Sequence, residues 1–485
     1  MANKPPAEPP QIAIRSVGLA TAQGCARELR AGAALSPPVP IPWPRDPRTA
    51  GSRHRPARGI EGDLTGPARM TELARRALAD CLGGEPLRPD VPLLLASCNG
   101  SAGTSDPDLW RSGFEMGAAL IGRDLPVASA ACASGLHALF LGTRLVQAGA
   151  DEVVVLAVDL TSAPAHANFE TLRILGDPEV EIPPWHPGRT GFILGEAGVA
   201  LRIGRADSND QQAPLLSELA LGYDLPDDEG LGRLLALLEP VAPTLVLGQG
   251  TGPSAVDRSE LAALAAGISL EVPLSTALHH FGHTLGASGL LSVGLAALAC
   301  GGSIPAALAM PGRSASDGRP LVTGTVSSRE TVVVCRALGG ACVACVVGPE
   351  RPVRRSPPHW RRAAPPPPLR DLNLRGMAQQ AMEHRPARPP DLLLVRLEAP
   401  LVPPHDARLA DRLLPSSILE MTPGFVAQLV AQTWGFAGAA VCLVGSERTE
   451  PDVAEIVRAC EAAGDVVFRL DVRGQGENRH VDWNC

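Results

Sequence analysis

The chain has 485 residues, a formal net charge of −8 and 45% hydrophobic residues, which allows more than one domain with a sizeable core. Its charges are scattered along the chain and form no strongly basic region, so binding to nucleic acid is not expected. No apolar run reaches the length of a membrane span, and the start lacks the apolar segment of a signal peptide, so we expect a cytoplasmic protein without a membrane partner. The eleven cysteines lie mostly in apolar runs, which predicts free thiols.

From Ile12 onwards, apolar runs alternate with amphipathic segments, whereas residues 1–10 are polar, rich in proline and predicted to be disordered. This alternation predicts a layered α/β architecture, in which the purely apolar strands are covered on both faces. In chain order we expect a helix over 70–84, strands over 91–98 and 125–131, a helix over 134–149, a strand over 151–160, and further strands and helices within 242–250, 257–267, 285–302 and 331–348.

The last part of the chain is similar in sequence to an earlier part. Residues 351–385 are too rich in Pro and Arg to form a core and predict a linker. Within residues 386–485, "RPPDLLLVRLEAP" is similar to "RPDVPLLLASCNG", and "AEIVRACEAAGDVVFRLDV" is similar to "LGTRLVQAGADEVVVLAVDL". This similarity predicts that residues 386–485 are a truncated copy of the earlier part. In the alignment, Gly445 or Ser446 falls near the position of Cys132, so the copy lacks this cysteine. Two ordinary α/β segments that look alike are the open alternative.

Cys132 lies between a predicted strand and a predicted helix, in "ASAACASGLHALF", among small residues. A thiol in the first turn of a helix lies near unpaired N–H groups and the positive end of the helix dipole, which favour the thiolate. The thiolate is the form that attacks thioesters, and small neighbours leave room for an acyl group. The alternative is a buried cysteine that packs as a small hydrophobe.

Two further stretches carry candidate residues. His283 lies in "GHTLGASG" before an apolar helix, and Gln249 lies in "LVLGQGTGPSAVDRSELAAL" after a strand. With "AACASGL" at Cys132, these stretches resemble three motifs of the β-ketoacyl synthases, the condensing enzymes of the thiolase superfamily. "GRTGFILGEAGVAL" resembles a fourth motif less closely. The resemblance covers roughly residues 11–350.

The resemblance implies a fold and an assembly. The expected α/β fold is thiolase-like, with two related halves, about residues 11–205 and 213–350, in five layers, α-β-α-β-α. The partial α/β segment 386–485 would follow. The family dimerises through the sheet next to the nucleophile, so we expect a homodimer or a heterodimer with another ketosynthase.

The resemblance also implies a chemistry. In the family, the cysteine takes an acyl chain from the phosphopantetheine of an acyl carrier protein, and two histidines promote decarboxylation of a malonyl thioester. The carbanion then attacks the acyl-cysteine, while backbone N–H groups hold the oxyanion. Carried over, Cys132 is the nucleophile and His283 polarises a carbonyl or enolate oxygen. The expected partner is an acyl carrier protein, and no cofactor is implied.

The chain departs from the family pattern at several positions. Gln249 stands in place of the second histidine, and glutamine donates a hydrogen bond but exchanges no proton near neutral pH. Ala277 or Leu278 stands where the family has a lysine. In "CRALGGACVAC", Leu338 replaces the gating phenylalanine and Cys342 replaces the asparagine. These losses affect condensation more than acylation.

Three functions therefore stay open. The first is an acyltransferase that loads Cys132 and then condenses or transfers the chain. The others are a non-elongating transacylase and a non-catalytic partner similar to the chain-length factors. Cys132 and His283 favour an enzyme, and His279 or His280 could replace the missing histidine. No Cys or carboxylate lies at ligand spacing from these histidines, so no metal site is expected.

Other motifs predict structural roles. Cys342 and Cys345 have the spacing of a redox pair but lie in an apolar strand, which predicts core residues. The glycine-rich turns have no nucleotide-binding spacing. Glu196 and Asp257 match family positions that support loops and helix starts.

Overall fold

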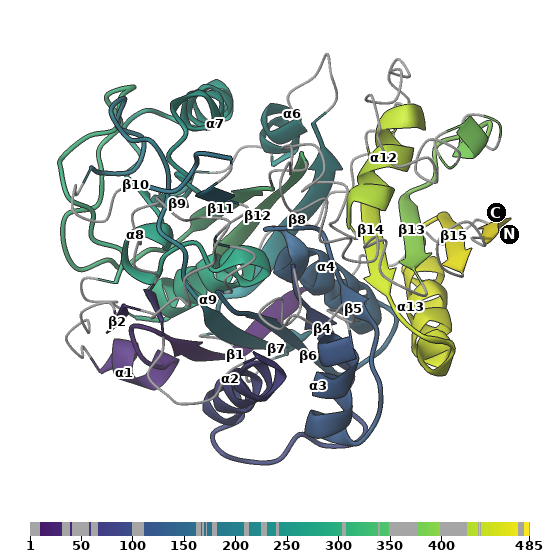
Figure 1. The fold of residues 1–485 in the computed structure, drawn as a ribbon. Helices are drawn as coiled ribbons and strands as arrows, with labels where there is room; N and C mark the ends of the chain where they lie inside the picture. Colours follow the sequence, from purple (N-terminus) through teal and green to yellow (C-terminus); the bar gives the residue numbers. More distant parts are fainter. Residues whose placement is uncertain are drawn as a thin grey trace, which may run out of the picture.

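Figure 1 shows the fold in a computed structural model of the chain. The predicted disordered segment, apart from Pro10, and most of the predicted linker lie outside the described residues, and the predicted domain boundaries stay predictions. The structure describes residues 10–31, 39–40, 58–59, 66–98, 111–161, 166, 169–170, 172–176, 182–207, 213–224, 230–238, 242–302, 307–337, 340–348, 377, 379–381, 383, 385–397, 424–434, 436, 438–473 and 480–484.

The strands of residues 11–350 form two groups with one topology. The first group is β1 (Ile12–Thr21), β4 (Leu93–Ala96), β5 (Val127–Ala128), β6 (Glu152–Asp159) and β7 (Ala197–Arg205), in the order β1-β7-β6-β4-β5. The second is β8 (Leu215–Tyr223), β9 (Leu245–Leu247), β10 (Leu274–Ser275), β11 (Thr331–Arg336) and β12 (Ala341–Gly348), in the order β8-β12-β11-β9-β10. In each group the first two pairings are antiparallel and the next are parallel. The groups join where β1 pairs with β8. A small separate sheet pairs β2 (Val39–Pro40) with β3 (Arg58–Gly59).

Helices cover both strand groups and fill the space between them. The outer helices of the first group are α2 (Gly66–Cys81) and α3 (Arg111–Ile121), and those of the second are α6 (Gly230–Leu237) and α7 (Ser254–Gly267). The central helices α4 (Ser134–Gln147) and α9 (Ser288–Cys300) contact each other and both strand groups. The predicted five-layer α-β-α-β-α arrangement is therefore confirmed. Short helices are α1 (Ala26–Arg30), α8 (Leu278–Phe281) and the 3₁₀ turn η2 (Leu285–Ala287).

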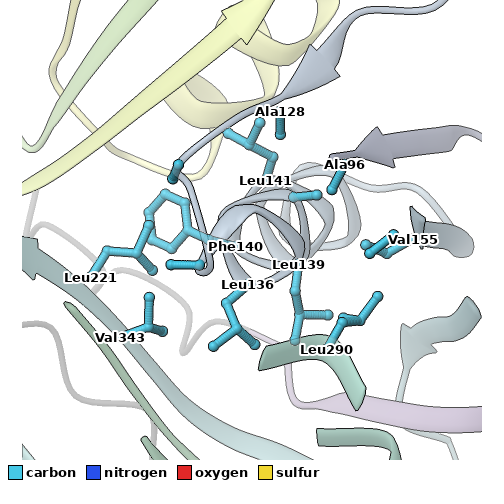
Figure 2. Close-up of a cluster of buried hydrophobic side chains, with 14 of the residues drawn as sticks. Ala96, Ala128, Leu136, Leu139, Phe140, Leu141, Val155, Leu221, Leu290 and Val343 are labelled. Atoms are coloured by element: carbon cyan, nitrogen blue, oxygen red, sulfur yellow. The ribbon is translucent and has the colours of Figure 1, made fainter. Parts of the chain in front are cut away.

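The central layer is covered on all sides, since twelve residues of α4 and twelve of α9 are buried. Figure 2 shows side chains of α4 pointing in different directions: Phe140 lies toward Leu221 of β8, Leu139 toward Leu290 of α9, and Leu141 toward Ala128 of β5. Glycine lets the two helices approach closely. A Cβ on Gly135 would lie 2.8 Å from the Leu290 Cβ. Packing of α4 on α9 thus depends on the absence of a side chain there.

Predicted and observed elements differ mainly at their ends. The predicted strand over 125–131 is paired only over Val127–Ala128, because the chain then turns sharply towards α4. Helix α2 begins at Gly66 rather than at residue 70, because the Gly-Pro pair at its start is compatible with a first helical turn.

The described C-terminal residues extend the same sheet. They include β13 (Leu392–Leu397), α12 (Gly424–Trp434), β14 (Ala439–Val444), the 3₁₀ turn η4 (Glu447–Thr449), α13 (Glu450–Ala462), β15 (Val467–Arg473) and β16 (His480–Asn484). Strand β14 pairs antiparallel with β5, which makes one sheet of fourteen strands. The edge of β5, beside the predicted nucleophile, is therefore occupied by the chain's own β14 (Figure 1).

Candidate active site

Cys132 lies in a tight turn between β5 and α4. Ala131 before it has a φ of 49°, in the left-handed region that alanine seldom adopts. The hydroxyl of Ser134 stabilises the turn, since it accepts from the Ala130 N–H at 2.9 Å and donates to the Ala131 carbonyl at 2.6 Å. The turn puts Cys132 between β5 and α4, as the sequence predicts, but two residues before the start of the helix rather than in its first turn, and the residue is 3% exposed.

His283 lies in the matching place of the second half, between β10 and α9. Its Nδ1 accepts a hydrogen bond from the Leu285 N–H at 3.1 Å, so the proton of the neutral ring is on Nε2. Burial lowers the pKa of His283 to about 4. The ring is therefore neutral at pH 7 and offers Nε2–H as a donor.

The fold joins the two halves at these turns. Helix α4, which starts beside Cys132, packs against α9, which starts after His283. The carboxylate of Asp159, at the end of β6, accepts from the Cys98 N–H at 2.9 Å and from the Gly286 N–H at 2.8 Å. It thereby ties the end of β4 to the histidine loop, and the structure brings Cys132 and His283 to one junction of the halves.

Two aromatic rings make the surroundings of His283 apolar. The Phe192 ring centroid lies 4.5 Å from that of His283, and the Phe169 centroid lies 6.4 Å from it. Both phenylalanines belong to a buried cluster with Cys98 and Leu285. This environment explains the lowered pKa of the imidazole. No motif in the sequence marks these rings as part of the site, although Phe192 lies in the fourth matched stretch.

The loop that carries Gln249 is held by a buried carboxylate. Glu260 on α7 accepts from the Gln249 N–H at 2.6 Å, from the Gly250 N–H at 2.9 Å and from the Trp185 Nε1–H at 2.7 Å. Asp257, one turn earlier, accepts from the Trp185 backbone N–H at 3.2 Å. Asp257 thus has the supporting role that the sequence predicts, and Glu260 is a second support that the prediction left out.

The side-chain amide of Gln249 is buried, and only one of its two polar atoms has a hydrogen-bond partner among the described residues. Its Oε1 accepts from the Arg336 N–H at 2.9 Å, and its Nε2 has no hydrogen-bond partner within the part of the chain that the structure describes. Arg336 follows Cys335, whose thiol donates to the Cys132 carbonyl at 3.5 Å. The Gln249 amide is therefore attached to the same end of β11 that contacts Cys132.

Two more thiols, those of Cys98 and Cys335, lie near Cys132, and no sequence motif marks either of them. Burial, and secondarily Asp159 and Cys132, raises the pKa of Cys98 well above its ordinary value. Burial, and then Cys132, does the same for Cys335. Both remain thiols at neutral pH and supply no competing thiolate. Among the described residues the cysteines form no disulfide bonds, as expected for thiols.

The other residues that the sequence suggested as possible site residues contribute no catalytic group where the structure describes them. The His280 Nε2 lies 2.6 Å from the Ala309 carbonyl oxygen. This hydrogen bond holds the ring in place, so it is not available to act in place of the histidine that the family has at position 249. Ala277 and Leu278 are buried and supply no cation. Leu338 lies outside the described residues. Among the described residues, no cluster of three His, Cys, Asp or Glu side chains has metal-binding geometry.

The predicted structural roles of the remaining motifs agree with their contacts. Cys342 and Cys345 are buried in β12 and belong to different hydrophobic clusters, on opposite sides of the sheet, so they form no redox pair. The Cys342 thiol donates to the Asp224 carboxylate at 3.4 Å. Glu196 accepts from the guanidinium of Arg69, with Nε at 3.1 Å from Oε2.

Known proteins are similar to this chain in sequence and in fold. No protein-family model matches the chain. The 3-oxoacyl-[acyl-carrier-protein] synthase 2 of Vibrio harveyi is 27% identical over 189 residues, 33% of this chain and 45% of that protein. The tetracenomycin polyketide synthase ketoacyl synthase alpha subunit of Streptomyces glaucescens is 28% identical over 199 residues, 36% of this chain and 47% of that protein. The chain is a divergent relative of the β-ketoacyl synthases. It matches less than half the length of these curated relatives.

Solved structures show the fold of this ketosynthase relative. The ketosynthase ApeO, in complex with its chain length factor ApeC from Xenorhabdus doucetiae, matches 72% of this chain and 100% of that chain, with 21% identity and a TM-score of 0.56. The PfaC keto synthase-chain length factor matches 97% of this chain and 74% of that chain, with 14% identity and a TM-score of 0.70. The predicted thiolase-like fold is confirmed. In the described part of the ketosynthase relative, no helix combines the length and the apolar character that crossing a membrane requires.

Proposed function

We propose that the chain is an acyltransferase of fatty-acid-like or polyketide biosynthesis. Cys132 would take an acyl group from the phosphopantetheine thioester of an acyl carrier protein and pass it on by transfer or condensation. The observation that carries the proposal is the matched placement of Cys132 before α4 and of a neutral, Nε2-protonated His283 before α9. The similarity to 3-oxoacyl-[acyl-carrier-protein] synthases supports it.

The first step needs a nucleophile and oxyanion donors. The Cys132 thiolate attacks the thioester carbonyl carbon, and a carbon–sulfur bond forms. The carbonyl oxygen gains negative charge, which the Nε2–H of His283 stabilises as a donor. The tetrahedral species then expels the pantetheine thiolate, which takes up the proton that Cys132 released on ionisation. The acyl group is thereby exchanged between two sulfurs.

The second step depends on Gln249. Its Nε2–H, which has no partner among the described residues, is a donor to a second carbonyl oxygen, such as that of an incoming thioester. An amide supplies no proton near neutral pH, so this residue supports binding but no acid–base step. Transfer to another oxygen, nitrogen or sulfur nucleophile thus places fewer demands on the site than decarboxylative condensation.

Intact-protein mass spectrometry tests acylation. The chain is incubated with hexanoyl-loaded acyl carrier protein, and an adduct of one hexanoyl group is expected. Cys132→Ala abolishes the adduct, whereas Cys81→Ala, a buried thiol of the outer helix α2, keeps it. An adduct that survives Cys132→Ala overturns the assignment of the nucleophile.

A non-catalytic partner of another ketosynthase is the second candidate. The 3% exposure of Cys132 favours it, because a phosphopantetheine arm has to reach the sulfur. Absence of any adduct in the same experiment, together with stable binding to a catalytically complete ketosynthase, would establish this function. Release of CO₂ from malonyl-loaded carrier protein separates condensation from simple transfer.

A further inference from the structure

The sheet has a palindromic strand order around one pair of strands. Outward from β5 the order is β4, β6, β7, and outward from β14 it is β13, β15, β16. On each side the first two pairings are parallel and the third is antiparallel. The central pair, β5 with β14, is antiparallel. A two-fold axis between two copies of one unit generates this pattern.

The helices follow the same relation. Helix α4 comes after β5 and leads to β6, and α13 comes after β14 and leads to β15. Helix α3 comes before β5, as α12 comes before β14. Helices α4 and α13 contact each other beside the central pair of strands (Figure 1). The described part of the C-terminal segment therefore has the place that a second copy of β4, α3, β5, α4, β6 and β7 would have in a symmetric pair.

The contacts across this boundary are those of a permanent interface. The Arg144 Nε donates to the Asp465 Oδ2 at 2.5 Å, and these side chains are 14% and 3% exposed. The buried hydroxyl of Tyr223 donates to the Ala440 carbonyl at 3.1 Å. One hydrophobic cluster runs through both sides and includes α4 as well as β13, β14 and α12. Buried, paired charges and a continuous core are costly to separate.

We propose that the C-terminal segment, in its described residues 386–397, 424–434, 436, 438–473 and 480–484, replaces the second subunit of a dimer. It docks on β5 of its own chain and closes that edge, so no second copy of the chain pairs there. The homodimer that the sequence resemblance implies would need the edge that β14 occupies. The inference concerns assembly alone and stands or falls independently of acyl transfer.

The C-terminal segment also stabilises the candidate site, through contacts that lead to Gln249. On α12, the Gln432 Nε2 donates to the Asp224 carbonyl at 3.4 Å. The Asp224 carboxylate accepts from the Arg336 Nε at 2.6 Å, and the backbone N–H of Arg336 holds the Gln249 amide. The C-terminal segment thus stabilises, through two residues, the backbone that orients Gln249.

A designed disulfide tests which chain supplies β14. Ala128 and Leu443 are directly opposite each other, next to the hydrogen-bonded Ser129 N–H and Cys442 carbonyl. Opposite residues of an antiparallel pair have the Cα separation that a disulfide needs. The full chain with Ala128→Cys and Leu443→Cys is oxidised with diamide, and the product is analysed by denaturing electrophoresis and peptide mapping. Ala128→Cys alone is the matched control.

The proposal expects a link within one chain, at single-chain mass, absent from the control. A link between two chains means that the segment is exchanged between copies and overturns the proposal. No link in the folded double variant shows that β5 and β14 are not paired and overturns it as well. If the double variant does not fold, light scattering of the native chain decides: a one-chain particle supports the proposal, and a two-chain particle overturns it.

Discussion

The Gln249 Oε1 accepts a hydrogen bond from the Arg336 backbone N–H at 2.9 Å. Because a backbone N–H can only donate, the amide oxygen must face β11, and the amide nitrogen must face away from it. That nitrogen is buried without a partner among the residues described. The chain therefore has a fixed, unsatisfied donor at the position where the sequence resemblance implies a histidine, and an unsatisfied buried donor favours binding of a carbonyl oxygen.

Gln249→His is expected to raise CO₂ release from malonyl-loaded carrier protein. An imidazole can accept and return a proton, and such a group typically contributes about 10²–10⁴-fold to the rate. The measurement is radiolabelled CO₂ release at saturating carrier protein. Gln147→His, at the opposite end of α4, is the control and should leave the rate unchanged. Equal rates for both variants and the native chain would contradict the role given to position 249.

The rate of Cys132 acylation should show no inflection near pH 6.5. Burial lowers the pKa of His283 to about 4, so the ring keeps its neutral donor form from about pH 5 upwards. His283→Ala should slow acylation by about 10²–10³-fold, the usual effect of losing one oxyanion donor. Stopped-flow or quenched mass spectrometry over pH 5–8 measures both. His280→Ala is the control, and an equal loss there would contradict the assignment.

His137→Leu is expected to stabilise the chain by about 1–3 kcal/mol, the usual cost of a buried unsatisfied polar group. His137 is fully buried on α4, and neither ring nitrogen has a partner among the described residues. Burial lowers its pKa to about 3, from an ordinary 6.5. Between these values the unfolded chain binds more protons, so native stability is full above pH 6.5 and declines as the pH falls towards 3.

Urea unfolding at pH 7 and pH 5 checks this expectation. The His137→Leu variant should show a larger unfolding free energy at both values and a smaller decline between them. The matched variant His186→Leu, at an exposed position, should change neither quantity by more than about 0.5 kcal/mol. A destabilised His137→Leu protein would mean that the ring has a polar partner.

Gly135→Ala should lower both stability and acylation. The added Cβ would lie 2.8 Å from the Leu290 Cβ and 3.0 Å from the Gly286 carbonyl oxygen, so α4 and α9 would have to separate. Overpacking of this kind costs about 1–3 kcal/mol, and the separation would move Cys132 relative to His283. Gly232→Ala on α6, with its nearest neighbour at 3.9 Å, is the control in thermal unfolding and acylation assays. A tolerant Gly135→Ala variant would show that the helix spacing is adjustable.

The order of elements could be predicted from the sequence because apolar periodicity records which faces are buried. The strand before Cys132 is the instructive exception. "LPVASAA" has the composition of a longer strand, but only Val127 and Ala128 are paired, because the Ser134 hydroxyl holds the next residues in a turn. Such a side-chain contact over four residues leaves no periodic signal.

For the site, the motifs located Cys132, His283 and Gln249 but not what surrounds them. Cys335, which contacts the backbone of Cys132, lies 203 residues further along the chain. Phe169 reaches His283 from a segment that matches no motif. Contacts over such separations arise from the topology of two interlocked halves, and a single sequence carries no pattern for them.

The antiparallel pairing of β5 with β14 has a practical consequence for recombinant work. A fragment that stops at residue 350 would retain Cys132, Gln249 and His283. It would, however, expose the unpaired edge of β5 and the apolar surface that β13, β14 and α12 cover in the full chain. Unpaired strand edges pair with strands of other molecules, so we expect such a fragment to aggregate. Expression of this protein therefore calls for the whole polypeptide, including the part that contributes no candidate catalytic group.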